Sequence, residues 1–376
     1  MKMNFFKHNI DKKDIANVVK TLQSLFITTG PVTAEWETQL AHFFNVPYAL
    51  GLNSCTAGLH LLLLGLGIGK GDEVIVPSLT FVSSVNVIEF VGAKPIFADV
   101  ETDTGLIDVK DVEKKITKKT KAIIGVHLYG QMVDVLALSK IAKKHKLKFI
   151  EDSAHGVDCM RDGYRPGQFS DGAAFSFYAT KNITSGEGGA IVTKHKALAE
   201  KIKVLRTHGM SKDSISRYHT SKFNQYDVKE LGYKYNMTDI QASLLIGQLK
   251  RIDENTAKRE KICQQWEKII DQLENIDYPK VKYGKSSRHL FSIWVDPAKR
   301  DKAIQYLNKQ GIPVSVHFKP VHTFTYYKKK YKKIKLKTTE RIGKSTISLP
   351  LYPQLTKKEI DYISATLKKL NSFLKV

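Results

Sequence analysis

Short apolar runs rich in β-branched residues alternate with longer amphipathic segments between residues 50 and 195. The short runs predict strands at Glu73–Val76, Pro95–Ala98, Ala122–Val126, Lys148–Glu151, Ala173–Phe177 and Ala190–Thr193. Apolar residues at helical spacing predict helices at Thr56–Leu66, Ser83–Val91, Asp108–Ile116 and Asp134–Lys144. Helices between strands indicate βαβ crossovers, so we predict an α/β domain with a mainly parallel sheet covered on both faces. Ligands of such sheets bind at the carboxyl ends of the strands.

The pattern changes in the last third of the chain. Apolar residues at helical spacing from Ile240 to Leu273 predict a long helical region that could connect two domains. Beyond Ser286 the pattern becomes β-α-β, in the order HLFSIWV, DKAIQYLNKQG and IPVSVHF, and a final helix is predicted at Lys357–Phe373. We therefore predict a large α/β domain in residues 1–250 and a smaller α+β domain in residues 251–376.

Composition narrows the class of protein. Of 376 residues, 42% are hydrophobic, which is enough to bury a sizeable core and unlike a disordered or collagenous chain. No apolar run approaches the ~20 residues that span a bilayer, and the charged start MKMNFFKHNIDKKD is unlike a secretion signal. Cys55, Cys159 and Cys263 are too few and too scattered for a disulfide framework or a zinc site. We expect a cytoplasmic globular protein with no metal and no membrane partner.

Lysine dominates the charge. Sixty Lys and Arg residues against 37 Asp and Glu residues give a formal net charge of +23. The densest tract, Tyr326–Lys337, interleaves aromatic residues with lysines. It could be a nucleic-acid or anionic-surface patch, a source of positive field for an anionic small molecule, or a solvated surface loop. We favour the loop, and the charge alone does not decide the function.

Three short motifs carry residues suited to chemistry. Residues 53–58, NSCTAG, precede an apolar helix, where small hydroxyl residues either bind phosphate or simply cap the helix. In KFIEDSAH, strand-like residues end in two carboxylates, and Asp152 either meets a protonated ligand nitrogen or is solvated. Lys181 follows a strand among aromatic and small residues, where a lysine can become a neutral nucleophile. A phosphate cradle, an acid and a Schiff-base lysine are the three groups that hold pyridoxal 5′-phosphate (PLP).

These motifs belong to a longer series that resembles the DegT/DnrJ/EryC1/StrS family of sugar aminotransferases. The resemblance covers nearly the whole chain, through NSCTAGLHLLLLGLGIGKGDEVIVPSLTFVSSVN, KTKAIIGVHLYGQMVD, IEDSAHG, FSFYATKN, GEGGA, LRTHGM, ELGYKYNMTDIQAS and SLPLYP. It implies fold type I of the PLP-dependent transferases. This α/β fold has a large domain, with a mainly parallel seven-stranded sheet between helices, and a smaller C-terminal α+β domain.

The resemblance also implies a set of cofactor-binding residues. Lys181 would hold the cofactor covalently and move protons, and Asp152 would pair with the ring nitrogen. The other contacts implied are Thr56, Ala57 and Ser176 at the phosphate, Phe81 on the ring face and His155 beside the ring's 3-oxygen. Lys234 or Asn236, within GYKYNM, would reach the phosphate bound by the partner subunit of a homodimer.

Further residues have two interpretations each. His317 and His322 lie in VHFKPVH, a stretch that resembles the family's sugar pocket, and each could be a substrate residue or a structural one. His208 and His289 could line the same pocket or lie elsewhere. Arg206 could recognise an acidic group or pair with a surface acid.

The implied function is amino transfer. Some relatives have histidine in place of the lysine and act as dehydratases, whereas this chain has Lys181. The variant KYN and the stretch VHFKPVHTFTYYKKKY resemble enzymes that aminate the C4 keto carbon of a UDP-linked sugar for amino-sugar and surface-glycan synthesis, with L-glutamate as donor. The alternatives are a 3-keto-sugar or keto-cyclitol aminotransferase of the same family, and a nucleic-acid-binding regulator on this fold.

Overall fold

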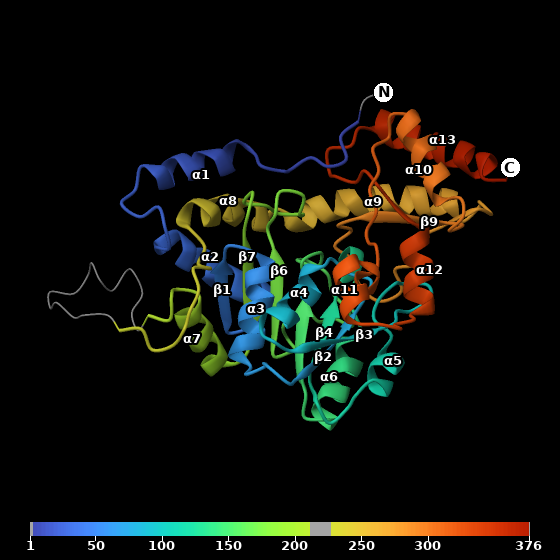
Figure 1. Ribbon diagram of the computed structural model, residues 1–376. Helices are drawn as coiled ribbons and strands as arrows, with labels where there is room; N and C mark the ends of the chain where they lie inside the picture. The colour runs from blue at the N-terminus through green and yellow to red at the C-terminus, as the bar shows by residue number, and fades with distance from the viewer. Residues whose placement is uncertain (1–2, 211–226, 376) are drawn as a thin grey trace.

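A seven-stranded sheet forms the centre of the computed structural model, which describes residues 3–210 and 227–375 (Figure 1). Its strands, in the order β1-β7-β6-β5-β4-β2-β3, are β1 (Tyr48–Leu52), β7 (Gly189–Thr193), β6 (Gly172–Ser176), β5 (Lys148–Asp152), β4 (Thr120–Val126), β2 (Glu73–Pro77) and β3 (Lys94–Ala98). Strand β7 pairs antiparallel with β1 and β6, and the other four pairs are parallel. The predicted mainly parallel sheet is confirmed.

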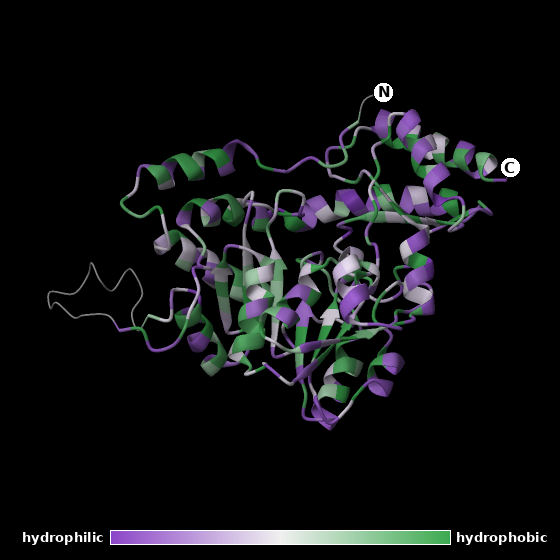
Figure 2. Cartoon of the chain, in the orientation of Figure 1, coloured by the Kyte–Doolittle hydropathy of each residue, from purple (hydrophilic) through white to green (hydrophobic). Residues whose placement is uncertain are grey.

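Helices cover both faces of this sheet, as predicted. One face packs against α3 (Cys55–Gly65), α4 (Ser83–Phe90) and α7 (Lys196–Leu205). The other packs against α2 (Pro31–Phe44), α5 (Val109–Lys114), α6 (Val135–Lys144) and α8 (Asp239–Lys250). Hydrophobic residues follow the strands and the inner faces of the helices (Figure 2), and all five residues of β2 are buried. Burial on two faces explains why these strands appear in the sequence as continuous apolar runs.

The six predicted strands and the helices between them lie within two residues of their observed bounds. Strand β1 was not predicted. It contains Gly51 and lies at the edge of the sheet, where β7 is its one neighbouring strand. Its pattern is therefore weaker than that of the central strands.

The long helical region predicted from Ile240 to Leu273 is divided into two helices. Helix α8 ends at Lys250 and α9 (Ile252–Ile270) begins after Arg251, whose φ of −110° and ψ of 16° leave the helical region. The Arg251 guanidinium forms ion pairs with Asp11 and Asp14 beside and within α1 (Lys12–Leu22), which packs against α8. The break lies where this arginine turns toward the N-terminal helix.

A second, three-stranded antiparallel sheet follows, in the order β10-β9-β8. Its strands are β8 (Ile276–Asp277), β9 (Phe291–Val295) and β10 (Thr346–Leu349), and its helices are α10 (Arg300–Lys309), α12 (Lys337–Ser345) and α13 (Lys357–Phe373). Trp266 of α9, Ile293 and Leu367 belong to a hydrophobic core on this smaller sheet. Lys250, after which we expect the boundary between the two domains, is the last residue of α8.

The strand predicted for IPVSVHF, residues 312–318, is wrong. This segment makes a single bridge to the small sheet, in which Ser315 and Ser348 exchange backbone hydrogen bonds of 3.2 and 2.7 Å. Pro313 has no N–H to donate to a ladder, and the end of the segment turns toward the large sheet. Strand β10 takes the expected place beside β9.

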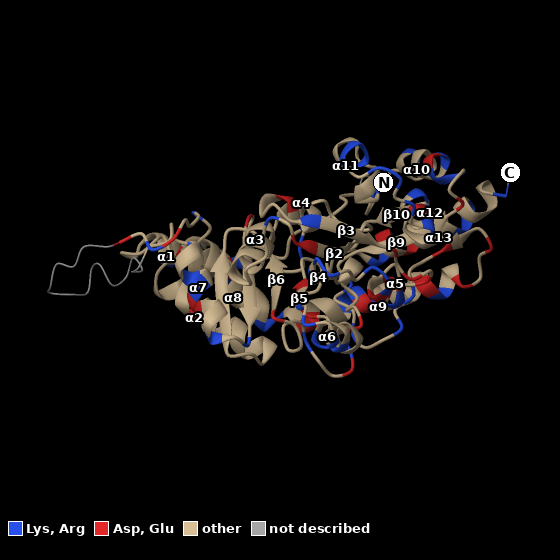
Figure 3. Ribbon diagram, turned by 60° about the horizontal axis from the view of Figure 1, so that its bottom comes forward, with Lys and Arg blue, Asp and Glu red and all other residues tan. Residues whose placement is uncertain are grey.

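The lysine-rich tract Tyr326–Lys337, for which we favour a solvated surface loop, is a loop only over residues 331–336. It begins in α11 (Thr325–Lys330), and Figure 3 shows lysines along that helix. Two of the three aromatic residues face the protein: Tyr327 is buried and its hydroxyl donates to Asn86 of α4 at 2.6 Å, while the Tyr331 hydroxyl donates to Glu89. Tyr326 is exposed. Tyr327 and Tyr331 therefore hold the tract on the protein.

Within the described ranges, no helix combines the length and hydrophobicity that crossing a bilayer requires.

Candidate active site

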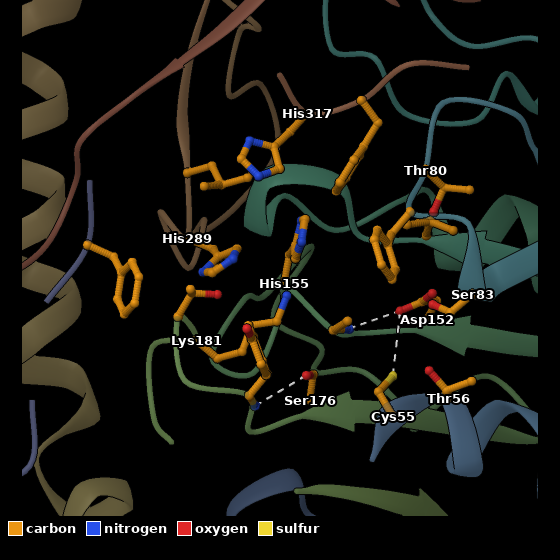
Figure 4. A pocket seen from close by; sticks show the side chains of 18 of the residues that line it. Cys55, Thr56, Thr80, Ser83, Asp152, His155, Ser176, Lys181, His289 and His317 are labelled. Atoms are coloured by element: carbon orange, nitrogen blue, oxygen red, sulfur yellow. Dashed lines mark hydrogen bonds between the residues drawn. The ribbon is translucent and has the colours of Figure 1, made fainter. Parts of the chain in front are cut away.

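A cavity of about 450 Å³ lies where the carboxyl ends of the parallel strands meet the segments around the small sheet (Figure 4). Its floor comes from the residues that follow β1, β2, β5 and β6, and its upper wall comes from residues 289–290, 317–318 and 349–351. A volume of this size suits a small cofactor or ligand. Its position at the strand ends agrees with the rule for open α/β sheets.

The predicted cradle is the first turn of α3. Ser54 is the N-cap residue, and its Oγ accepts a hydrogen bond of 3.1 Å from Ala57 N. Thr56 lines the cavity, as does Ser176 at the end of β6, whereas Ala57 is buried behind them. Helix capping and phosphate binding, the two interpretations of residues 53–58, are therefore compatible. The capped helix presents the positive end of its dipole to the cavity, where a phosphate could bind.

Gly189, at the start of β7, allows the strand to lie directly against this turn. A Cβ at that position would be 2.2 Å from the carbonyl carbon of Ser54 and 2.5 Å from Cys55 N. Any side chain there would push the cap away from the strand. The glycine is therefore required by close approach of two backbones.

Asp152, the last residue of β5, is held from three sides. Its Oδ2 accepts from Ser84 Oγ at 2.7 Å, and its Oδ1 accepts from Ala154 N at 3.0 Å. The Cys55 thiol lies 3.8 Å from Oδ1, and the carboxylate is 4% exposed. A buried carboxylate with fixed donors is rigid and still lines the cavity, so it can face a cationic ligand atom.

Lys181 lies in the turn after β6, where its backbone N donates to Tyr178 O at 2.9 Å. Burial lowers the pKa of its ammonium group from 10.5 to about 8, against the opposing influence of Cys55 and Asp152. A larger fraction of Lys181 side chains is therefore neutral at pH 7 than of ordinary lysines. The sequence-based expectation of a nucleophilic lysine agrees with this environment.

Three histidines line the cavity beside Lys181, and Figure 4 shows His317, His289 and His155 along one wall. The His155 and His289 rings have centroids 4.4 Å apart. Burial, then the Lys181 charge, lowers the pKa of His317 to about 4, and burial lowers the pKa of His155 and His289 well below 6.5. All three imidazoles are neutral at pH 7.

Hydrogen bonds fix the tautomers of two of these rings. Tyr129 N donates to His155 Nδ1 at 3.3 Å, so His155 carries its proton on Nε2. Asn182 donates from Nδ2 to Ser287 O at 2.6 Å, which leaves its Oδ1 to accept from His289 Nδ1 at 3.2 Å. His155 is therefore a donor through Nε2, and His289 is an acceptor through Nε2.

The remaining candidates lie apart from the cavity or at its edge. Phe81 lines the cavity with 57% of its surface exposed, which leaves room for a ring on its face. His322 does not line it, because its Nδ1 lies 2.7 Å from Ser78 Oγ and the residue is buried there. Its place is structural, whereas His317 faces the cavity.

Lys234 and Asn236 do not line the cavity of their own chain. Lys234 is exposed and forms a bridge with Thr207, and Asn236 is buried with its Nδ2 donating to Thr29 at 2.6 Å. Arg206 is also buried, and it bonds Glu37 of α2 and Gly51 O. The arginine therefore pairs with Glu37 of the same chain.

Sequence reasoning missed several residues of the cavity. The missed lining residues include Phe5, Phe6, Thr80, Ser83, Tyr178 and Thr180, and Ser84 bonds Asp152 from the start of α4. Thr80 and Ser83 follow β2, so their position after a predicted strand was a usable signal. Phe5 and Phe6 precede every predicted element, and no periodic pattern in the sequence points to them.

Residues 8–368 match the DegT/DnrJ/EryC1/StrS aminotransferase family. The chain belongs to this family. This sugar aminotransferase is similar to UDP-4-amino-4-deoxy-L-arabinose–oxoglutarate aminotransferase of Shewanella sediminis, with 38% identity over 374 residues and 96% of each chain covered. It is also similar to Helicobacter pylori PseC, an aminotransferase involved in the biosynthesis of pseudoaminic acid, with a TM-score of 0.93, 31% identity, and 99% and 100% of the two chains covered.

The solved PLP form of Spr1654 from Streptococcus pneumoniae superposes with a TM-score of 0.92 and 33% identity over 99% of each chain. The fold is that of the type I PLP-dependent aminotransferases, and PLP is the cofactor of this sugar aminotransferase. The cavity fits that group: a first helical turn with hydroxyl side chains suits the phosphate, a fixed carboxylate suits a pyridinium nitrogen, and the buried lysine suits the aldehyde carbon.

Proposed function

We propose that this sugar aminotransferase transfers the amino group of L-glutamate to the C4 keto carbon of a UDP-linked sugar, as a step in amino-sugar and surface-glycan synthesis. The observation that carries the proposal is a lysine with a lowered pKa and a fixed, buried carboxylate in one cavity. The name of the Shewanella sediminis relative supports three parts of the proposal: UDP as the nucleotide, C4 as the aminated carbon, and glutamate with oxoglutarate as the amino donor and its product.

Lys181 is the proposed base and acid of the reaction. When bound, PLP supplies an electron sink that stabilises negative charge on the carbon next to the transferred nitrogen. The Lys181 amine removes the proton from Cα of glutamate as a general base and returns protons as a general acid. Burial lowers its pKa toward the working pH, where a base and its conjugate acid are both populated.

Asp152 is proposed to keep the proton on the ring nitrogen of the cofactor. A carboxylate that faces a pyridinium favours its charged form, and a protonated ring withdraws more electron density. Ser84 and Ala154 hold the carboxylate in one orientation, so it does not have to reorganise as charge develops.

The other cavity residues have proposed positions around the same groups. Nε2–H of His155 is a donor suited to the ring's 3-oxygen, because its tautomer is fixed by Tyr129 N. Thr56, Ser176 and the first turn of α3 are suited to the phosphate, with Ala57 behind them, and Phe81 to the ring face. His317 is suited to a sugar hydroxyl at the upper wall.

A panel of keto sugars tests the function directly. The enzyme loaded with the aminated cofactor is incubated with UDP-, dTDP- and GDP-linked 4-keto and 3-keto sugars and with keto-cyclitols, and the products are identified by mass spectrometry and NMR. We expect amination at C4 of a UDP-linked sugar. If only a 3-keto sugar or a keto-cyclitol is aminated, the protein is instead a 3-keto-sugar or keto-cyclitol aminotransferase. If none of these compounds is aminated, both functions are refuted.

We also propose a homodimer that shares its sites. Among the described residues that line the cavity, Lys181 is the single lysine or arginine, so the phosphate site of one chain has no cation of its own apart from the catalytic lysine. Lys234 is exposed on its own chain and resembles the family's segment that reaches the partner's phosphate, with Asn236 as the alternative. A twofold dimer would place two such segments reciprocally.

Complementation tests the shared site. Lys181→Ala and Lys234→Glu chains should each be inactive as pure dimers, because one lacks the catalytic amine and the other repels phosphate. In a mixed dimer, one of the two sites has an intact Lys181 and an intact partner segment. Each mixed dimer should therefore have up to about half of the activity of a wild-type dimer. Formation of mixed dimers, shown by differently tagged chains, without any return of activity would exclude sharing through this segment.

A further inference from the structure

The first described residues of the chain lie along the protein and contact it at both ends of the segment. Residues 3–9, the N-terminal strap, run from the small sheet toward α1 along the upper side of Figure 1. At one end Met3 is 6% exposed and belongs to the hydrophobic core of the small sheet. At the other end Asn9 accepts from Arg251 through its backbone oxygen at 2.9 Å and from Gln354 through Oδ1 at 2.7 Å. The strap is therefore fixed at both ends.

Between these two anchors, Phe5 and Phe6 line the cavity. The Phe5 ring lies nearly parallel to the imidazole of His317, at 20° and 6.0 Å between centroids. His317 is also held at its ring edge, where Nδ1 lies 2.9 Å from Ser348 Oγ of β10. Phe5 is therefore the aromatic neighbour, within the strap, of the histidine that we assign to the sugar.

We propose that Phe5 is a substrate-contacting residue: the N-terminal strap forms the outer wall of the sugar subsite and selects for the sugar over the amino donor. Lys181 and Asp152 lie on the floor, on the turn after β6 and at the end of β5, where both substrates must react. Glutamate is small enough to react on the floor alone. A nucleotide-linked sugar is longer and has to extend along the wall that carries Phe5 and His317. The identity of this ligand rests on the function proposed above.

Steady-state kinetics of Phe5→Ala separates the two substrates. Removing an aromatic ring from an apolar contact should lower kcat/KM for the nucleotide sugar about 10- to 100-fold. The half-reaction with glutamate, followed by the loss of the cofactor absorbance in the absence of sugar, should stay within about twofold of the wild type. Phe5→Tyr, which keeps the ring, should restore most of the sugar kinetics. Leu25→Ala, at a residue 89% exposed and outside the cavity, is the matched control.

A second readout follows the His317 imidazole itself. Burial and the charge of Lys181 lower its pKa to about 4, and His155 and His289, which line the same cavity, are other titratable rings near it. Removal of the Phe5 ring admits water, so the pKa of His317 should rise toward 6.5 in Phe5→Ala. A histidine-selective NMR titration of the full chain between pH 3.5 and 7.5 measures it. Leu25→Ala should leave it near 4.

The outcomes separate the strap from the proposed function. Loss of sugar kinetics with intact glutamate kinetics and a raised His317 pKa would establish the contact. An unchanged kcat/KM for the sugar, or equal losses in both half-reactions of a folded variant, would overturn it. If Phe5→Ala fails to fold, Met3→Asn, which loosens the anchor outside the cavity, should reproduce the selective sugar defect. If the wild type aminates no nucleotide sugar, the proposed function fails, while the titration still decides whether Phe5 shields His317.

Discussion

Replacement of Lys181 by alanine is expected to abolish turnover, by at least ~1,000-fold, while the fold and some noncovalent cofactor binding remain. The reason is that one amine has both proposed roles: it would hold the cofactor and it would move the proton between the substrate carbon and the cofactor. No other described lysine or arginine lines the cavity to replace it. The measurement is the initial rate of 2-oxoglutarate formation, together with the absorbance of the purified variant after it is mixed with the cofactor.

Lys196→Ala is the matched control for this variant. Lys196 lies at the start of α7, its side chain is 74% exposed, and its ion-pair partner is Glu200 on the same helix. The control should keep wild-type kinetics and absorbance. Activity of Lys181→Ala above a few per cent of the wild type would show that a different amine carries the reaction, and the site assignment would then be lost.

Replacement of Asp152 by asparagine is expected to slow the glutamate half-reaction at least ~100-fold, which corresponds to about 3 kcal/mol of lost charge stabilisation. The amide keeps the size of the carboxylate and one oxygen, which can accept from Ala154 N. Its NH2 group would face Ser84 Oγ, which can accept that hydrogen bond and donate its own proton to Phe81 O, so the change removes mainly the negative charge. Without that charge the ring nitrogen loses its proton more readily, and cofactor affinity falls as well. Stopped-flow absorbance measures the half-reaction, and titration of the cofactor-free protein measures affinity.

The control for charge removal is Asp301→Asn. Asp301 has a side chain 78% exposed and pairs with the neighbouring Arg300, far from the cavity lining. Ser84→Ala should give an intermediate rate, because it loosens the carboxylate without neutralising it. A glutamate half-reaction unchanged in Asp152→Asn would mean that another group faces the ring nitrogen.

The central strands could be predicted because a strand buried on both faces appears in the sequence as a continuous apolar run. Strand β2, with all five residues buried, is an example. Elements whose pairing partners lie far along the chain could not be predicted from local sequence patterns. The segment 312–318 has the composition of a strand, yet β10, about thirty residues later, takes the ladder beside β9. Likewise Arg251 interrupts an otherwise continuous helical pattern because Asp11 and Asp14, near the start of the chain, draw its guanidinium away.

The same distinction applies to the site. Asp152, Ser176 and Lys181 could be predicted to converge because each lies at or just after the end of a predicted strand of one sheet. Thr56 follows β1, which was not predicted, and its place came from the family resemblance; the structure brings all four residues to one cavity. His322 shares a short motif with His317, but a hydrogen bond to Ser78 takes it out of the cavity. Phe5 and His289 come from segments that meet the cavity only through tertiary packing. Their positions depend on how the small sheet sits against the large one, which short-range patterns do not encode.

The contact between Gly189 and Ser54 has a consequence for how the enzyme can change over time. Because two main chains touch there, the turn proposed to bind the phosphate is ordered when the protein folds, so phosphate binding at this turn would cost little further conformational entropy. Side chains of the upper wall come from other segments and can be substituted without moving this turn. If the proposed site is correct, the enzyme can acquire a new sugar substrate through changes in that wall while the backbone that binds the cofactor stays the same.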